Sequence, residues 1–120
     1  MSKEYEAIKE CGTYYLVTIN GDYPAARPFG SLKEIDGDIY FSTNDRNEAH
    51  KQLRANPHVQ IVASKPQGGW IRMTGLATEA TDPEIKNKML EGSRMKARYE
   101  EMGIEHFLVF KFTVEKAEYK

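Results

Sequence analysis

The chain has 120 residues, a length that fits one domain built around one hydrophobic core. Hydrophobic residues make up 40% and charged residues 29%, the balance of an ordinary soluble globular protein. Seventeen basic and eighteen acidic side chains give a net charge of -1, which argues against recognition of bulk nucleic acid or of an anionic membrane surface. No apolar run approaches the length needed to cross a bilayer.

The single cysteine, Cys11, excludes an internal disulfide. The charged start MSKEYEAIKE has no apolar secretory segment behind it. Together these features predict a protein of the reducing cytoplasm.

A short helix and three consecutive strands are expected first. Residues Ser2 to Glu10 suit an amphipathic helix with Tyr5 and Ile8 on one side, and Gly12 ends it. The β-branched and aromatic run TYYLVTI is followed by NGD, a strong hairpin signal. A returning strand over Tyr23 to Ile35 meets a second such signal, DGD, before the strand IYFST. The three strands form an antiparallel meander.

The segment DRNEAHKQLRAN is predicted to be a helix. Asp45 is its expected N-cap, Glu48 is the reciprocal partner of a capping box, and Pro57 closes it. The runs HVQIVAS and WIRMTGLATEAT then resume β structure.

A helical region is expected to open at Thr81 or Asp82 and to run to about Met102, with a break near Gly92 and Ser93. In the final strand HFLVFKFTVEKAEY, alternation puts four apolar side chains on one face: Leu108, Phe110, Phe112 and Val114. The pattern as a whole predicts the α+β class, with six strands in a small antiparallel barrel and helices at its periphery.

Most chemistry-bearing residues show no catalytic pattern. His50, His58 and His106 lack metal-ligand spacing, and Cys11 is distant from all three in sequence, so we expect neither a metal site nor a nucleophilic cysteine. A Walker-type phosphate loop and a dinucleotide fingerprint are both missing. Three methionines near the run ARYEEMG are interpreted as packing residues: Met89, Met95 and Met102.

The run FSTND suggests an anion site, because a strand ends there in two hydroxyls and an amide just before a helix. Ser42 and Thr43 would donate to the anion, and Lys51 would add a charge from the helix. Simple helix capping by Asn44 or Asp45 explains the same residues, and a capping carboxylate would compete with an anion.

The run AARPFGSLKEI carries three residues that suit a strand poorly. Arg27 is charged, Pro28 cannot donate to a ladder, and Gly30 lets another group lie against the backbone. A planar ligand resting on this strand would use all three features, whereas an irregular edge strand explains them without a ligand. The DGD hairpin makes this strand a sheet neighbour of Ser42 and Thr43, so Arg27 and the two hydroxyls are expected to meet over one phosphate.

Trp70, the only tryptophan, begins a strand in which Arg72 and Thr74 share its face. A partly exposed tryptophan beside an arginine suits ring stacking or a subunit contact, and an ordinary exposed barrel face is the alternative.

Four stretches in order, GTYYLVTINGDYPAARPFG, DGDIYFSTND, KQLRANPHVQIVA and GGWIRMTGLA, resemble the flavin-binding split-barrel family related to pyridoxamine 5′-phosphate oxidase, in its small bacterial branch. The resemblance runs from about Tyr5 to Phe112. It implies an antiparallel split β-barrel, 1–120 as one domain, that forms a homodimer with FMN in two clefts at the subunit interface.

Carried onto this sequence, the resemblance implies one cofactor site shared by two subunits. Arg27 would reach the FMN phosphate, and Lys51, or its competitor His50, would be a basic phosphate ligand. Trp70 would approach the flavin from the second subunit. Backbone contacts to the isoalloxazine ring would come from Pro28, Phe29 and Gly30, and contacts to ribityl or phosphate from Ser42, Thr43 and Asn44.

The function implied is an FMN-dependent oxidoreductase that takes electrons from NADH or NADPH and reduces a small acceptor such as a nitroaromatic or a flavin. The alternative is a dimer that binds FMN or another planar cofactor, haem or a deazaflavin, without turnover. Oxidation of pyridoxamine phosphate itself is not expected, because that oxidase continues into a basic C-terminal segment and carries a basic and aliphatic run where this chain has PFGSLKEI. No residue is assigned as acid, base or nucleophile.

Overall fold

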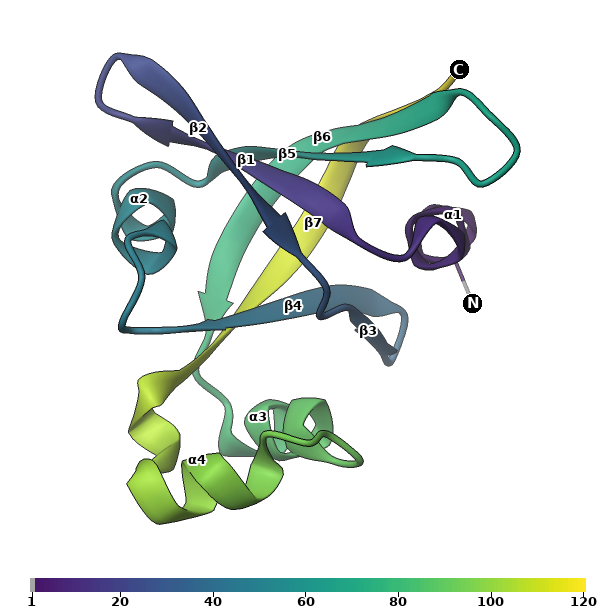
Figure 1. Cartoon of the computed structure of the whole chain (residues 1–120). Helices are drawn as coiled ribbons and strands as arrows, with labels where there is room; N and C mark the ends of the chain where they lie inside the picture. The colour runs from purple at the N-terminus through teal and green to yellow at the C-terminus, as the bar shows by residue number, and fades with distance from the viewer. Residues whose placement is uncertain (1) are drawn as a thin grey trace.

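A computed structural model describes residues 2–120 and shows one antiparallel sheet that curls into a barrel-like form (Figure 1). The strand order is β2-β1-β5-β6-β7-β4-β3. The strands are β1 (Tyr14–Asn20), β2 (Tyr23–Phe29), β3 (Lys33–Ile35), β4 (Asp38–Asn44), β5 (His58–Ser64), β6 (Trp70–Ala80) and β7 (Phe107–Tyr119). The helices are α1 (Lys3–Cys11), α2 (Ala49–Ala55), α3 (Pro83–Leu90), α4 (Lys96–Met102) and the 3-10 turn η1 (Ile104–His106).

The α+β class is confirmed, but the prediction of six strands is wrong, because the described residues form seven. The expected strand Tyr23 to Ile35 is two strands, β2 and β3, separated by the segment 30–32. These two strands lie at opposite edges of the sheet, so the ladder does not close. Pro28 offers no N–H and Gly30 has no side chain, which makes this the place where pairing with β1 stops at little cost.

Helix α1 begins and ends where its sequence indicates. The Ser2 hydroxyl accepts a hydrogen bond from the Tyr5 N–H at 3.2 Å, and Gly12 follows the last turn with a φ of 81°. Tyr5 and Ile8 are buried, and Cys11 packs beside the core. No helix within residues 2–120 is long and apolar enough to cross a membrane.

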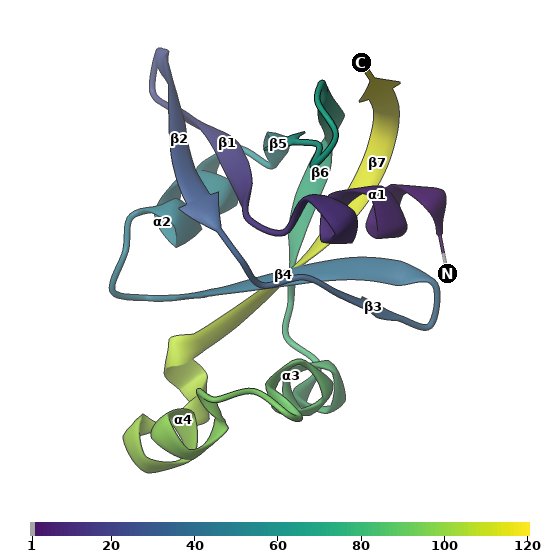
Figure 2. The same ribbon diagram turned by 45° about the vertical axis from the view of Figure 1, so that its right-hand side comes forward.

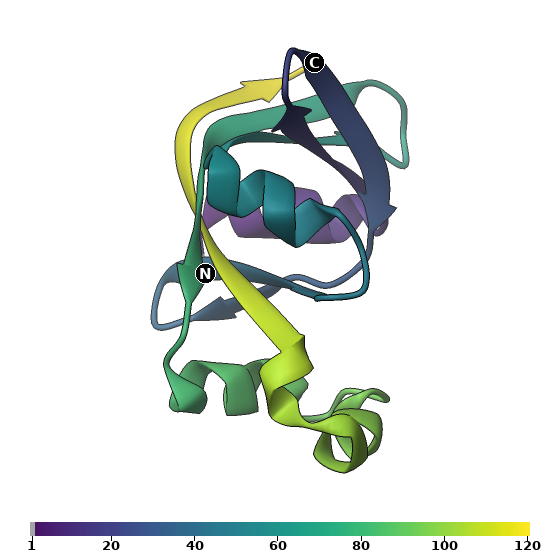
Figure 3. The same ribbon diagram turned by 90° about the vertical axis from the view of Figure 1, so that its left-hand side faces the viewer.

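The main core fills the concave side of the sheet, where α1 and α2 lie (Figures 2 and 3). Phe41 and Phe110 stack there with ring centroids 5.7 Å apart. The alternation predicted for the last strand is confirmed, since Leu108, Phe110 and Phe112 belong to this core and Val114 packs against it. Residues of both helices enter the same core, so it fixes the curvature of the sheet.

A second cluster of buried residues lies on the other face of β4 and β7, under α3 and α4. Tyr99 of α4 packs against Phe107 of β7 with centroids 5.0 Å apart. The helical region is broken as predicted, because α3 ends at Leu90 and α4 begins at Lys96. β4 and β7 are therefore covered on both faces, and this arrangement places α3 and α4 beside the ends of the strands.

Candidate functional site

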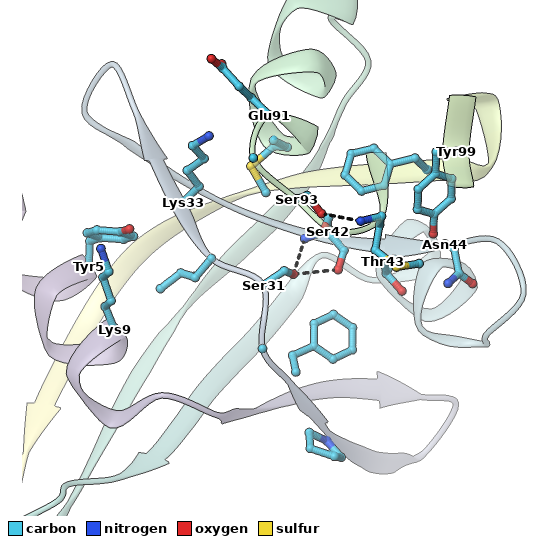
Figure 4. Close-up of a pocket in the computed structure, with 18 residues that line it drawn as sticks. Tyr5, Lys9, Ser31, Lys33, Ser42, Thr43, Asn44, Glu91, Ser93 and Tyr99 are labelled. Atoms are coloured by element: carbon cyan, nitrogen blue, oxygen red, sulfur yellow. Dashed lines mark hydrogen bonds between the residues drawn. The ribbon is translucent and has the colours of Figure 1, made fainter. Parts of the chain in front are cut away.

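A pocket of about 700 Å³ opens where the chain leaves β2 and crosses β4 (Figure 4). Its floor is the segment 28–33 together with the end of β4, Ser42 to Asn44. Tyr5 and Lys9 of α1 line one side. The volume is that of an ordinary small-molecule or cofactor site.

A set of hydrogen bonds around Ser31 holds this crossing in place. The Tyr14 hydroxyl donates to the Ser31 carbonyl at 2.7 Å. The Ser31 hydroxyl donates to the Ser42 carbonyl and accepts from the Ser42 N–H, both at 3.0 Å (Figure 4). Burial raises the pKa of the Tyr14 phenol, which keeps it protonated as a donor. The backbone of Gly30 and Ser31 is thereby fixed against β4 although no strand ladder joins them.

The other end of the pocket floor lies next to the start of α2. The Thr43 hydroxyl accepts from the Asn47 side-chain amide at 2.6 Å, and the Asn44 side chain accepts from the Arg46 N–H at 2.9 Å. Thr43 is 8% exposed. The structure thus brings Pro28, Phe29 and Gly30 together with Ser42 and Thr43 at one pocket.

Residues of α3, α4 and the loop between them form a cover over the pocket, which we call the α3–α4 cover (residues 83–102). Several residues of this cover line the pocket, among them Met89, Glu91, Ser93, Met95 and Tyr99. Sequence reasoning assigned the methionines to packing alone. Nothing in their local pattern distinguishes a pocket wall from a core, because the cover meets the pocket only through the tertiary arrangement.

Arg27 does not line this pocket in the single chain. The premise that its strand neighbours the strand of Ser42 is wrong, since β2 pairs with β1 and β4 pairs with β3 and β7. The guanidinium turns toward α2: Nη1 donates to Thr18 Oγ1 at 2.8 Å and Nη2 donates to Gln52 Oε1 at 2.6 Å. Nη1 also donates to the Leu16 carbonyl at 3.3 Å. Burial lowers the pKa of Arg27.

Three expectations about the second helix need correction. The capping box is wrong: Asp45 does not cap α2, and the Asn47 side chain accepts from the Ala49 N–H at 3.0 Å. His50 is 5% exposed, with Nδ1 2.6 Å from the Asn47 carbonyl, so it is a satisfied core residue. Lys51 points to solvent, with its Nζ 3.6 Å from Glu48 Oε2. Neither His50 nor Lys51 lines the pocket.

Asp45 instead pairs with His106, which precedes β7. His106 Nδ1 lies 2.7 Å from Asp45 Oδ2, and the Asp45 N–H donates to the His106 carbonyl at 3.3 Å. The hydrogen bond lowers the pKa of Asp45 and raises that of His106. Asp45 directly follows the pocket floor in the chain, and His106 follows the α3–α4 cover. Their hydrogen bond therefore connects the pocket floor to the cover.

Replacing Asp45 by asparagine is expected to lower the pKa of His106 toward its ordinary value of about 6.5. The raised pKa of His106 contributes stability below about pH 6.5 that is lost as pH rises through the folded-state value. The lowered pKa of Asp45 contributes stability above about pH 4 that is lost in acid. The difference in melting temperature between wild type and Asp45→Asn should therefore be largest near pH 5 to 6 and should shrink by pH 8. NMR titration of the His106 ring protons measures the pKa directly, and an unchanged value would disprove the pairing.

Trp70 is 38% exposed and lies outside the pocket of its own chain. Its ring stacks on the Arg72 guanidinium, whose central carbon is 5.1 Å from the ring centroid. In residues 2–120, no group of three or more histidine, cysteine or acidic side chains is gathered as a metal ion would require.

Comparisons with known proteins agree with this fold. The family model described as pyridoxamine 5′-phosphate oxidase matches residues 1–120. A crystal structure of a NimC/NimA family protein from Clostridium acetobutylicum is 35% identical, with a TM-score of 0.81 over 92% of this chain and 80% of that one. A search of curated proteins found no match.

Two more distant structures share the fold. One, from Clostridium acetobutylicum, is described as related to general stress protein 26, of the pyridoxinephosphate oxidase family; it is 18% identical, with a TM-score of 0.76 over 98% of this chain and 85% of that one. The other, an FAD-binding protein from Mesorhizobium loti, is 16% identical, with a TM-score of 0.66 over 98% and 92% of the two chains. Since the family model covers the whole sequence, this chain belongs to the pyridoxamine 5′-phosphate oxidase family.

Proposed function

We propose that this protein is an FMN-dependent oxidoreductase of the cytoplasm that takes electrons from NADH or NADPH and reduces a small acceptor such as a nitroaromatic or a flavin. The observation that carries the proposal is the pocket floor. The segment of Gly30 and Ser31, which leaves the ladder after Phe29, is held by hydrogen bonds beside two hydroxyl side chains, Ser42 and Thr43.

The pocket suits a planar group. A β-carbon placed on Gly30 would meet no atom within 4 Å, so the backbone there is open to a ring lying flat against it. Phe29 is fixed beneath this segment by contacts with Tyr14 and Phe41 at centroid distances of 6.2 and 5.9 Å. FMN bound here would supply the hydride chemistry, and the protein would supply orientation and polarity.

The phosphate of the cofactor is assigned to the side of the pocket near α2. A guanidinium has five N–H donors, and Arg27 uses three of them on neutral acceptors. No carboxylate within residues 2–120 forms an ion pair with it. Arg27 contacts Gln52 and Thr43 contacts Asn47, so α2 and the turn before it link the two proposed phosphate ligands. A half-buried cation with spare donors favours an anionic ligand.

A homodimer is part of the proposal. The convex face of β1, β5 and β6 points away from all four α-helices (Figures 1 and 3). One row of paired residues crosses this face in the order Pro28, Tyr15, Val62, Arg72 and Glu118. Tyr15 is 52% exposed. The row begins at the pocket-lining Pro28, so a second copy seated on this face would also border the pocket.

Three measurements test the proposal together. The purified protein mixed with FMN should show a shifted flavin spectrum and a raised melting temperature. Stopped-flow mixing with NADH or NADPH should bleach the flavin, and sedimentation velocity should show a dimer. Bound flavin that stays oxidised would favour the alternative, a carrier of FMN or another planar cofactor. The absence of any flavin binding would disprove the FMN-dependent oxidoreductase and the FMN carrier alike, and would leave only a carrier of a different planar cofactor.

Gly30→Val is expected to weaken FMN binding at least about tenfold while leaving the cofactor-free protein nearly as stable as wild type. In the cofactor-free protein the added side chain meets open space, so the free energy of unfolding should change by no more than about 0.5 kcal/mol, as for a surface substitution. The loss of FMN affinity arises because the valine side chain occupies the space in which the flavin ring would lie. FMN titration and thermal melts measure the two effects. Thr78→Val, an exposed change on β6 outside the pocket, is the control. Equal FMN affinities for all three proteins would exclude Gly30 from the site.

A further inference from the structure

Trp70 packs one face of its ring against a cation on its own strand. Its ring lies against the Arg72 guanidinium, with 5.1 Å between the central guanidinium carbon and the ring centroid. Trp70 and Arg72 are two residues apart on β6 and therefore share the convex face of the sheet. At 38% exposure, the Trp70 residue leaves aromatic surface open for a second copy to cover.

Arg72 is itself fixed by a carboxylate on the neighbouring strand. Its Nε donates to Glu118 Oε1 at 2.9 Å and its Nη2 donates to Oε2 at 3.0 Å. This fork-to-fork geometry restrains the guanidinium plane more strongly than a single contact does. The plane of Arg72 in turn sets the plane of the Trp70 ring that stacks on it.

The position of this cluster on the convex face relates it to the pocket. In the row from Pro28 to Glu118, Val62 is the middle residue, and the two ends lie about 19 Å apart at about 4.8 Å a strand. A twofold axis that lies in an interface on this face and crosses the row at Val62 exchanges the two ends of the row. In such a dimer Glu118 of one copy lies over Pro28 of the other and Arg72 lies over Tyr15, so Trp70, beside Arg72, comes next to the pocket-lining segment of the other copy.

We infer that Arg72, restrained by Glu118, is a positioning residue that orients Trp70 so that its free face closes the cofactor pocket of a second copy. This inference rests on the proposed function, because it requires the dimer and the planar cofactor. The Arg72–Glu118 ion pair takes on a role that the sequence did not suggest. In this role the ion pair fixes the orientation of the Trp70 ring before the cofactor binds.

The test uses Trp70 as its own reporter, since it is the only tryptophan in the chain. Time-resolved anisotropy of the cofactor-free dimer should show faster local motion of Trp70 in Arg72→Met and in Glu118→Gln than in wild type. FMN affinity should fall about 2- to 5-fold in both variants, the loss expected for one exposed cation–π contact. Arg72→Lys keeps the charge without the fork and should give intermediate values.

The control is Arg54→Met, which breaks the other two-point arginine–glutamate pair, with Glu79 at 2.7 and 2.9 Å, away from any tryptophan. It should leave both the anisotropy and the FMN affinity as in wild type. In a Trp70→Ala background, Arg72→Met should cause no further loss of FMN affinity, because a positioning residue acts only through the group it positions.

The outcomes separate the two claims. Failure of the wild-type protein to bind FMN or to dimerise would overturn the proposed function and the pocket-closing role with it. Normal FMN binding by wild type, combined with unchanged Trp70 anisotropy in Arg72→Met and Glu118→Gln, would overturn the positioning role alone. An equal loss of affinity from Arg72→Met with and without Trp70 would show that Arg72 acts independently of the ring.

Discussion

Arg27→Ala is expected to weaken FMN binding by about 2–3 kcal/mol, or about 30- to 150-fold, because it removes a charge-assisted contact to the phosphate. The side chain is half-buried, and its charge faces only neutral acceptors within residues 2–120. Isothermal titration of the cofactor-free protein with FMN measures the loss. FMN affinity equal to that of wild type would remove Arg27 from the site.

The control for Arg27 is Thr18→Val. Thr18 is 1% exposed and accepts from the guanidinium, so both variants disturb the same hydrogen bonds between β1, β2 and α2. Both should lower the melting temperature, but Thr18→Val keeps the cation and should keep most of the FMN affinity. A comparable loss of affinity in the two variants would mean that Arg27 acts through stability and not through the phosphate.

Phe41→Ala is expected to lower the free energy of unfolding by about 3–5 kcal/mol, the range for a phenylalanine removed from a core. Phe41 is fully buried, stacked on Phe110 and in edge contact with Phe29. Its loss therefore also loosens the segment that forms the pocket floor. Urea denaturation followed by circular dichroism measures the change.

Tyr23→Ala is the matched control for Phe41, because Tyr23 is a 76% exposed aromatic residue beside the first hairpin turn. It should change the free energy of unfolding by no more than about 0.5 kcal/mol. Similar losses in the two variants would contradict the assignment of Phe41 to the core.

The elements that the sequence predicted well depend on neighbours along the chain. The NGD turn places Gly21 at a φ of 62°, and the DGD turn places Asp36 and Gly37 at 51° and 86°. These backbone conformations are ones that glycine, asparagine and aspartate adopt readily, so two hairpins follow from short-range chemistry. The cap at Ser2 and the break between α3 and α4 are local in the same sense.

The expectations that failed required knowledge of distant partners. A strand over Tyr23 to Ile35 is reasonable by alternation, but pairing with β1 ends at Phe29 and the chain then crosses to β4. Asp45 is a common N-cap residue type, and Glu48 follows it three residues later as in a capping box. The Asp45 carboxylate nevertheless pairs with His106, 61 residues away. In both cases a tertiary contact overrides the structure that the local sequence favours.

The sequence by itself determined the class of fold and the hairpins, because periodicity and turn chemistry act between residues close in the chain. Only the tertiary structure decided the direction of the Arg27 side chain, the position of the α3–α4 cover and the stacking of Trp70 on Arg72. Each of these depends on which strands become neighbours in the sheet, and that order is set by burial of the whole core rather than by any short segment.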